Sequence, residues 1–185
     1  YAAYEGKAYS VATDIVTGRP EYFRIRDMRE DIDKIRASAS LPLVSRNVKI
    51  DGKYYLDGGL SDSIPLQKSV LDGNRKNIVV MTKETGYIRK PSTQIGLIKL
   101  RYLKYPKVTE LMTERHINYN EQLAYIERQQ ANGQAFVIRP RVPSNVGRVE
   151  KDADKLRELY RQGYEDAEAC YEAMTEYLGP QNLDS

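Results

Sequence analysis

Asp57 is followed at once by Gly58 and Gly59, and these three residues have the clearest potential for chemistry in the chain. A carboxylate can act as a general base when rigid neighbours fix its direction and small residues leave room for a substrate or a nucleophile. Two glycines also let the backbone turn sharply or approach another group without a Cβ in the way. Because Asp and Gly are common turn formers, a plain turn is the alternative interpretation.

The segment before Asp57 is predicted to be a β-hairpin. Val48-Lys49-Ile50 and Tyr54-Tyr55-Leu56 flank Asp51-Gly52, a dipeptide that tolerates the positive φ angles of a tight hairpin turn. The second strand runs directly into Asp57. We therefore expect this carboxylate at a strand end, with open space in front of it.

Further motifs extend the pattern on both sides of the hairpin. Ala37-Ser38-Ala39-Ser40-Leu41-Pro42 precedes it, and Ile64-Pro65 follows the Asp-Gly-Gly motif. Together with Val11-Ala12-Thr13-Asp14 upstream and Val146-Gly147-Arg148 near the far end, these residues resemble the second half of the patatin-like phospholipase family, in its bacterial members. The resemblance covers most of the chain.

The resemblance implies a serine acyl hydrolase with a Ser-Asp dyad. In this dyad Asp57, which precedes the Gly58-Gly59 turn, activates the serine. It implies a lipid or acyl ester substrate and no metal or organic cofactor. The family's glycine-rich oxyanion loop and its Gly-x-Ser-x-Gly nucleophile elbow precede this region, and neither motif occurs in these 185 residues. We therefore expect residues 1–185 to be the C-terminal portion of a single patatin-like domain, with the nucleophilic serine upstream and the fragment alone inactive.

Five serines lie close to Asp57 in the sequence, and each is a candidate nucleophile. None has the glycine-flanked strand-to-helix elbow that exposes a serine oxygen, so we expect turn and cap hydroxyls instead. These serines are Ser38, Ser40, Ser45, Ser61 and Ser63.

Three other reactive side chains are assigned structural roles. Asp14 precedes a turn, where an Asp commonly accepts hydrogen bonds from nearby backbone amides. His116 is the single histidine and falls on the apolar side of a predicted helix, and such a lone histidine is more often structural than catalytic. Cys170 lies within an apolar helical stripe, which predicts a buried packing thiol.

The order of the predicted elements indicates an α/β fold. We expect the C-terminal part of a three-layer α/β/α patatin-like fold with additional C-terminal helices. Residues 1–90 form the α/β part with the Asp-Gly-Gly motif, and residues 91–185 are mainly helical with one further strand near 134–139. The predicted strands are 7–15, 22–25, 77–82 (buried on both faces of a parallel sheet) and 135–138, and the predicted helices are 27–37 (opened by Asp27), 66–71, 92–105, 108–130 and 150–178.

Residues 89–107 are rich in Lys and Arg, contain no Asp or Glu, and include many Ile, Leu and Tyr residues. A helix over 92–105 could pack against the sheet with its lysines snorkelling to water. Alternatively, it could lie on an anionic membrane surface, where each basic side chain contributes about 1 kcal/mol. A non-catalytic membrane- or partner-binding module built on this helix is the alternative to the hydrolase.

Composition narrows the class of protein. A chain of 185 residues with 41% hydrophobic content is long enough for one domain with a real core. The formal net charge is only +3 and no binding motif is visible, so nucleic acid is not an expected partner. No apolar run approaches the roughly 20 residues that cross a bilayer. We expect a cytoplasmic location, with peripheral membrane association as the alternative.

Overall fold

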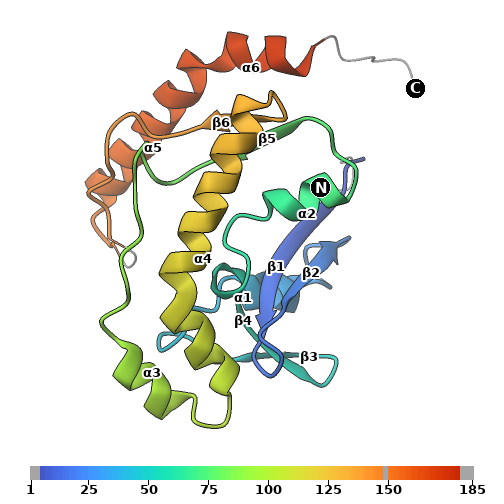
Figure 1. Ribbon diagram of the computed structural model, residues 1–185, viewed down its shortest axis with the longest axis vertical. Coiled ribbons are helices and arrows are strands. Elements are labelled where there is room, and N and C mark those ends of the chain that lie inside the picture. Colours follow the sequence, from blue (N-terminus) through green and yellow to red (C-terminus); the bar gives the residue numbers. More distant parts are fainter. Residues whose placement is uncertain (1–4, 148–149, 180–185) are drawn as a thin grey trace. The chain divides into compact units, whose positions relative to one another are not determined.

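The computed structural model describes residues 5–147 and 150–179 (Figure 1). Its elements combine strands and helices along the whole described chain, so the α/β class expected from the sequence is confirmed as a mixed α/β structure. In chain order they are β1 (Ala8–Asp14), β2 (Pro20–Ile25), α1 (Ile32–Ser38), β3 (Val48–Ile50), β4 (Lys53–Asp57), the 3-10 helix η1 (Gly58–Leu60), α2 (Leu66–Leu71), β5 (Asn77–Val80), α3 (Ile95–Arg101), α4 (Pro106–Ala131), β6 (Ala135–Ile138), α5 (Ala153–Ala169) and α6 (Tyr171–Leu178).

The described residues form two compact units that do not follow the order of the sequence. Unit 1 combines the residues up to Pro65 with Arg89–Leu123, and unit 2 combines Leu66–Ile88 with the residues from Ala124 onward. The long helix α4 therefore contributes its first part to unit 1 and its last part to unit 2.

Unit 1 is built on a four-stranded sheet in the order β2-β1-β4-β3, in which every neighbouring pair is antiparallel. The predicted hairpin joins β3 to β4, and its turn residues Asp51 and Gly52 have φ angles of 47° and 81°. Two successive positive φ angles match the right-handed twist of the flanking strands. The hairpin prediction is therefore confirmed, and it delivers β4 to its place beside β1.

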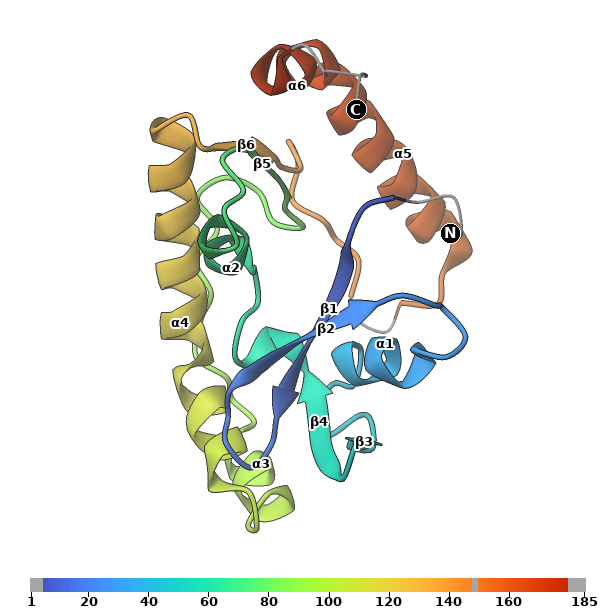
Figure 2. The same cartoon turned by 90° about the vertical axis from the view of Figure 1, so that its right-hand side faces the viewer.

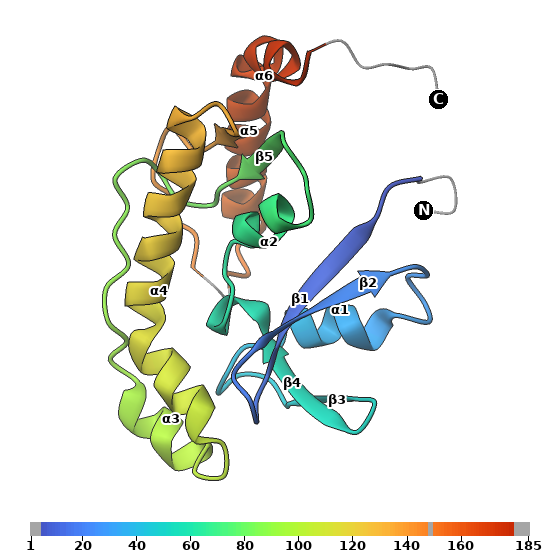
Figure 3. The same ribbon diagram turned by 45° about the vertical axis from the view of Figure 1, so that its right-hand side comes forward.

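Helices cover both faces of this sheet. Tyr55 packs with Ala12, Val48 and Ala37 of α1, whereas the next residue, Leu56, packs with Ile98 of α3 and other residues of α3 and α4. Because successive side chains of a strand point to opposite faces, the two clusters lie on opposite sides of the sheet. Figures 2 and 3 show the same arrangement, with α1 on one side and α3 with the start of α4 on the other.

Unit 2 contains a parallel pair of strands, β5 and β6, in register from Asn77↔Ala135 to Val80↔Ile138. The strand predicted at 77–82 exists, but its predicted burial on both faces is wrong. Asn77 and Val79 are buried whereas Ile78 and Val80 are exposed, because only one face of the strand is covered within the described residues. Helix α2 contacts β5 as its neighbour in this unit.

Several helix boundaries differ from the prediction. Helix α1 begins at Ile32 instead of Asp27, because the Asp27 carboxylate accepts the amides of Arg29 and Glu30 and closes a separate turn. The basic helix predicted over 92–105 is confined to α3, Ile95–Arg101.

The predicted helix 150–178 is divided at Cys170 into α5 and α6, and α5 has no buried residue. The prediction that Cys170 is a buried packing thiol is also wrong. It is half-buried, its thiol donates to the Ala167 carbonyl, and it lines a cavity of about 580 Å³ in unit 2.

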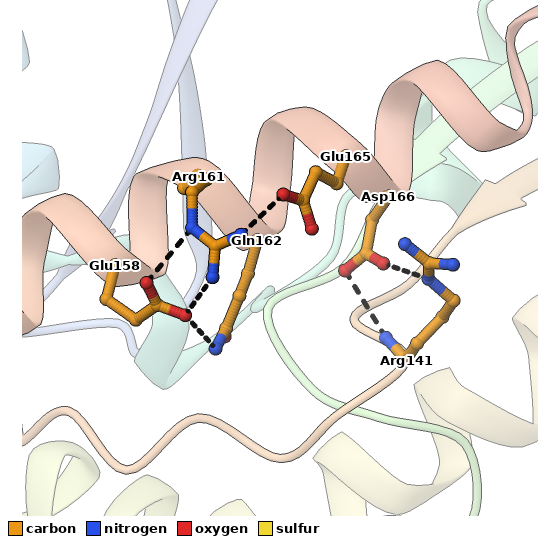
Figure 4. A network of polar contacts seen from close by, with 6 residues as sticks. All are labelled: Arg141, Glu158, Arg161, Gln162, Glu165 and Asp166. Atoms are coloured by element: carbon orange, nitrogen blue, oxygen red, sulfur yellow. Dashed lines mark hydrogen bonds and ion pairs between the residues drawn. The ribbon is translucent and has the colours of Figure 1, made fainter.

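Charged side chains support α5 along its exposed surface (Figure 4). Arg161 bridges Glu158 one turn before it and Glu165 one turn after it, at 2.7 Å each. Arg141, which follows β6, contacts the Asp166 carboxylate through both Nε and its backbone amide. This carboxylate raises the pKa of the Arg141 guanidinium. The Arg161 pairs are exposed and contribute little to stability. The Arg141–Asp166 pair connects the residues after β6 to α5.

Candidate active site

Asp57 is the last residue of β4, and its side chain caps the short helix η1 that follows. One carboxylate oxygen, Oδ1, accepts the amide of Gly59 at 2.7 Å. This bond orients the carboxyl group, and within residues 5–147 and 150–179 the second oxygen, Oδ2, has no hydrogen-bond partner. The prediction that Asp57 lies at the end of a strand is therefore confirmed.

The backbone of Asp57 is held on both sides. Its amide donates to the Ser40 carbonyl at 2.8 Å, and its carbonyl accepts the hydroxyl of Thr13 at 2.8 Å. Thr13 in turn contacts the Ser61 hydroxyl at 2.8 Å, where Ser61 must be the donor because the Thr13 proton is already used. The strand end carrying the carboxylate is thus tied to β1, to the second residue after α1 and to the residue after η1.

The register of the sheet decides where the Asp57 side chain points. Asp57 pairs with Ala12 across the β1–β4 ladder, and it lies two residues after Tyr55, so all three side chains share the face covered by α1. On that side lies a cavity of about 530 Å³, lined by Asp57 together with Ser10, Ile35, Ser38 and other residues of unit 1. The carboxylate is half-buried at this cavity.

Gly58 and Gly59 are needed for two different steric reasons. A Cβ on Gly58 would lie 2.3 Å from the Val11 carbonyl oxygen, a backbone atom of β1 that can move only if the strand itself shifts. A Cβ on Gly59 would lie 2.7 Å from the Asp57 Oδ1 and 3.0 Å from the Arg115 guanidinium. The first glycine therefore allows the loop to pack on the sheet, and the second leaves space for the carboxylate.

Two residues of α4 position this loop, and sequence reasoning did not identify either of them. Arg115 Nε donates to the Gly59 carbonyl at 2.8 Å, which the Ser63 hydroxyl also contacts at 2.8 Å. Gln122 accepts the Ile64 amide at 3.1 Å. Because these partners are 56 and 58 residues apart in sequence, no local pattern indicates the pairing.

A second carboxylate, Asp62, also lines the cavity, but its oxygens already have partners. Gln122 Nε2 donates to Oδ1 at 2.7 Å and the Tyr22 hydroxyl donates to Oδ2 at 2.6 Å. Sequence reasoning gave no role to Asp62. Its contacts join β2, the loop after η1 and α4, so the side chain has a structural role in this arrangement.

The serines near Asp57 mostly use their hydroxyls in local hydrogen bonds. Ser40 donates to the Arg36 carbonyl at 2.7 Å, as Ser63 does to Gly59. Ser38 lines the cavity, but it is the last residue of α1 and so does not occupy a strand-to-helix elbow. These contacts agree with the structural roles expected of them.

Asp14 and His116 make local contacts. Asp14 Oδ1 accepts the amides of Val16 and Thr17 at 2.8 and 3.1 Å, which confirms its predicted role in the turn. His116 Nδ1 lies 3.1 Å from the Thr113 carbonyl within its own helix. Across residues 5–147 and 150–179, no three His, Cys, Asp or Glu side chains gather closely enough to hold a metal ion. In the same part of the chain, no helix is both long and apolar enough to span a bilayer.

Comparison with known proteins gives two matches in separate parts of the chain. Residues 13–68 match the patatin-like phospholipase family, and residues 105–179 match a domain of unknown function, DUF6363. The first match contains Asp57, both glycines and the Thr13 contact, and it confirms the resemblance inferred from these motifs.

The chain is also 26% identical over 151 residues to an uncharacterized protein of Escherichia coli K12, YjjU. The match covers 78% of this chain and 41% of that protein. The chain therefore spans less than half the length of this curated relative.

Proposed function

We propose that this chain, with its patatin-like phospholipase segment at residues 13–68, carries the general base of a serine acyl hydrolase. The base is Asp57, and the nucleophile is a serine outside these 185 residues. The observation that carries the proposal is the Asp57 carboxylate itself. It is fixed through Oδ1 by the Gly59 amide, its second oxygen has no partner among the residues that the structure describes, and it lies at a cavity of about 530 Å³.

In this mechanism Asp57 accepts the proton of the serine hydroxyl as the serine oxygen attacks an acyl carbonyl. The C–O bond to the leaving alcohol then breaks, and the proton passes from Asp57 to the departing oxygen. A water molecule then attacks the acyl-enzyme while Asp57 takes a proton from it. The bond between the acyl carbon and the serine oxygen breaks, the proton passes from Asp57 to the serine oxygen, and the fatty acid is released. Backbone amides of a glycine-rich loop outside this chain hold the oxyanion, at about 3 kcal/mol per donor.

The proposed fold follows from the same family match. We infer that residues 1–185 form the C-terminal portion of one three-layer α/β/α patatin-like domain, with α5 and α6 as additional helices. The helices on both faces of the unit 1 sheet support this inference. The proposed substrates are lipids or other acyl esters.

The test uses the full-length protein with a soluble short-chain acyl ester. Asp57→Asn keeps the shape of the side chain and removes its basicity, and it is expected to lower kcat by about 10²- to 10⁴-fold. Asp51→Asn is the matched control, because Asp51 lies in the hairpin turn, where Asn tolerates a positive φ. The control should retain wild-type kcat, and all three proteins should have the same far-UV circular dichroism.

Labelling with a fluorophosphonate locates the nucleophile directly. The reagent is expected to modify one serine outside residues 1–185 in the full-length protein and to leave the 185-residue chain unlabelled. Labelling of Ser38 or another serine of this chain would show that the proposed division of the dyad is wrong. An Asp57→Asn variant with unchanged kcat would exclude Asp57 as the base.

A further inference from the structure

Helix α3 presents apolar side chains on both of its sides. On the inner side Ile98 is fully buried, and Tyr102, directly after the helix, is 1% exposed in the cluster with Leu56. On the outer side Leu97 and Leu100 are 61% and 71% exposed, and Leu103, two residues after the end of the helix, is 74% exposed. A helix packed on a sheet usually turns polar residues to water, so three outward leucines at intervals of three residues need a different explanation.

Basic side chains accompany these leucines. Lys99, Arg101 and Lys104 are exposed, and among the described residues none of the three pairs with a carboxylate. Arg101 lies over the ring of Tyr102 at 5.4 Å, which keeps its guanidinium beside the helix. No Asp or Glu occurs between Glu84 and Glu110, so the local charge is positive without compensation from its own segment.

We propose that these residues form an anchoring face that binds the surface of an anionic phospholipid bilayer. We define the anchoring face as Leu97, Lys99, Leu100, Arg101, Leu103 and Lys104. The leucines enter the boundary between headgroups and acyl chains, and the cations contact lipid phosphates. Apolar area and positive charge on one short segment are the two contributions to interfacial binding. The positive charge of the face complements an anionic leaflet, and this complementarity favours a bilayer over a protein as the partner.

The position of α3 defines what this face can do. It packs on the Leu56 side of the sheet, whereas the Asp57 side chain and its cavity lie on the side covered by α1. The anchoring face is therefore a docking surface and not a route for the acyl chain to Asp57. The inference builds on the proposed function, because an acyl hydrolase of lipids must meet a membrane, but binding is measured without turnover.

The experiment is co-sedimentation of the full-length protein with vesicles of phosphatidylcholine alone or with added phosphatidylglycerol. The chain should bind the mixed vesicles and bind much less to phosphatidylcholine alone. Raising the salt from about 0.1 M to 1 M shortens the Debye length from about 10 to 3 Å and should weaken the binding.

Two triple variants separate the contributions. Lys99→Gln, Arg101→Gln and Lys104→Gln together should lower the partition coefficient by about 100-fold, since each cation contributes about a fivefold factor. Leu97→Ser, Leu100→Ser and Leu103→Ser together should lower the partition coefficient by on the order of 100-fold. This decrease should be nearly the same at low and at high salt.

Matched controls test whether the location matters. Lys7→Gln, Lys53→Gln and Arg75→Gln remove three positive charges from exposed sites elsewhere, so both basic triples bring the formal net charge of residues 1–185 from +3 to 0. This control triple should retain most of the binding. Leu71→Ser, at a leucine exposed to a similar degree on α2, should bind like the wild type. Asp57→Asn should also bind like the wild type, which keeps this test independent of catalysis.

Three results would overturn the inference. Failure of the wild-type protein to sediment with vesicles that contain phosphatidylglycerol would show that it has no anchoring face. Equal losses in the two basic triples would show that net charge, and not this face, causes binding. Wild-type binding by the triple leucine-to-serine variant, with unchanged circular dichroism, would show that the leucines do not enter the bilayer. A protein partner would then be the better explanation for their exposure.

Discussion

The amide of Gly59 donates a 2.7 Å hydrogen bond to Oδ1 of Asp57, and a Cβ on Gly59 would lie at the same 2.7 Å from that oxygen. The residue that orients the carboxylate can therefore carry no side chain without displacing it. Gly59→Ala in the full-length protein should lower kcat by roughly 100-fold, the cost of an active group moved by about 1 Å. Hydrolysis of a soluble acyl ester measures this effect.

The control for Gly59 is Gly96→Ala, since no heavy atom lies within 4 Å of a Cβ at this position of α3. It should retain wild-type kcat. If Gly59→Ala is as active as Gly96→Ala, the geometry around Asp57 does not limit the reaction.

Gly58→Ala should lower the stability of the fold and not only the rate of the reaction. The added Cβ would lie 2.3 Å from the Val11 carbonyl oxygen, so β1 or η1 must shift. We expect the free energy of unfolding in urea to fall by about 3 kcal/mol. Gly163→Ala, within α5 and with open space around the Cβ, should instead raise it by about 0.5–1 kcal/mol through helix propensity. Equal values for the two variants would contradict the close approach at Gly58.

Gln122→Leu should weaken the loop that follows η1. The substitution leaves the Ile64 amide and one oxygen of Asp62 without their partner, at an expected cost of about 1–3 kcal/mol of unfolding free energy. Gln67→Leu tests the same replacement at an exposed site on α2 and should change stability by less than about 0.5 kcal/mol. Denaturant titration of both variants measures the difference, and a Gln122 effect as small as that of Gln67 would contradict the role assigned to these bonds.

Asp31 should make stability depend on acid pH. The side chain accepts a hydrogen bond from Lys34 and from the amides of Arg26 and Asp27, and these bonds lower its pKa from 3.8 to about 2. Because the folded state binds this proton less tightly than the unfolded chain, the stabilisation is complete above about pH 3.8 and is lost as the pH falls through about 2.

Thermal unfolding of Asp31→Asn measures this dependence. The variant should have a lower Tm than the wild type at pH 6, and the difference should shrink towards pH 2. Asp33→Asn, which removes only an exposed pair with Arg36, should change Tm little at either pH. A constant difference between Asp31→Asn and wild type across this range would contradict the assignment.

Features set by a few adjacent residues could be predicted from the sequence. The Asp51-Gly52 hairpin, the strands at 77–80 and 135–138, the turn role of Asp14 and the position of Asp57 at a strand end all follow from backbone preferences that act over a few positions. The patatin-like resemblance was visible for the same reason, since its motifs are short and contiguous.

Features that depend on distant partners could not be predicted. Residues 92–105 have an apolar and basic pattern throughout, yet only Ile95–Arg101 is helical. The pattern 150–178 continues through Cys170, where the structure has two helices. Burial could not be predicted for the same reason. Alternate residues of β5 are exposed although most of the strand is apolar, because burial depends on which elements cover each face.

By itself, the sequence determined that a carboxylate ends a hairpin strand before two glycines, because turn chemistry and strand alternation are local properties of the chain. Only the tertiary structure decided what holds the backbone next to that carboxylate: Thr13 on β1, Ser40 after α1, and Arg115 on α4. These contacts join segments far apart in the chain, and the packing of two helical layers on a twisted sheet selects them. The same packing turned Ile98 inward and left Leu97 and Leu100 exposed, a difference that their shared apolar character could not reveal.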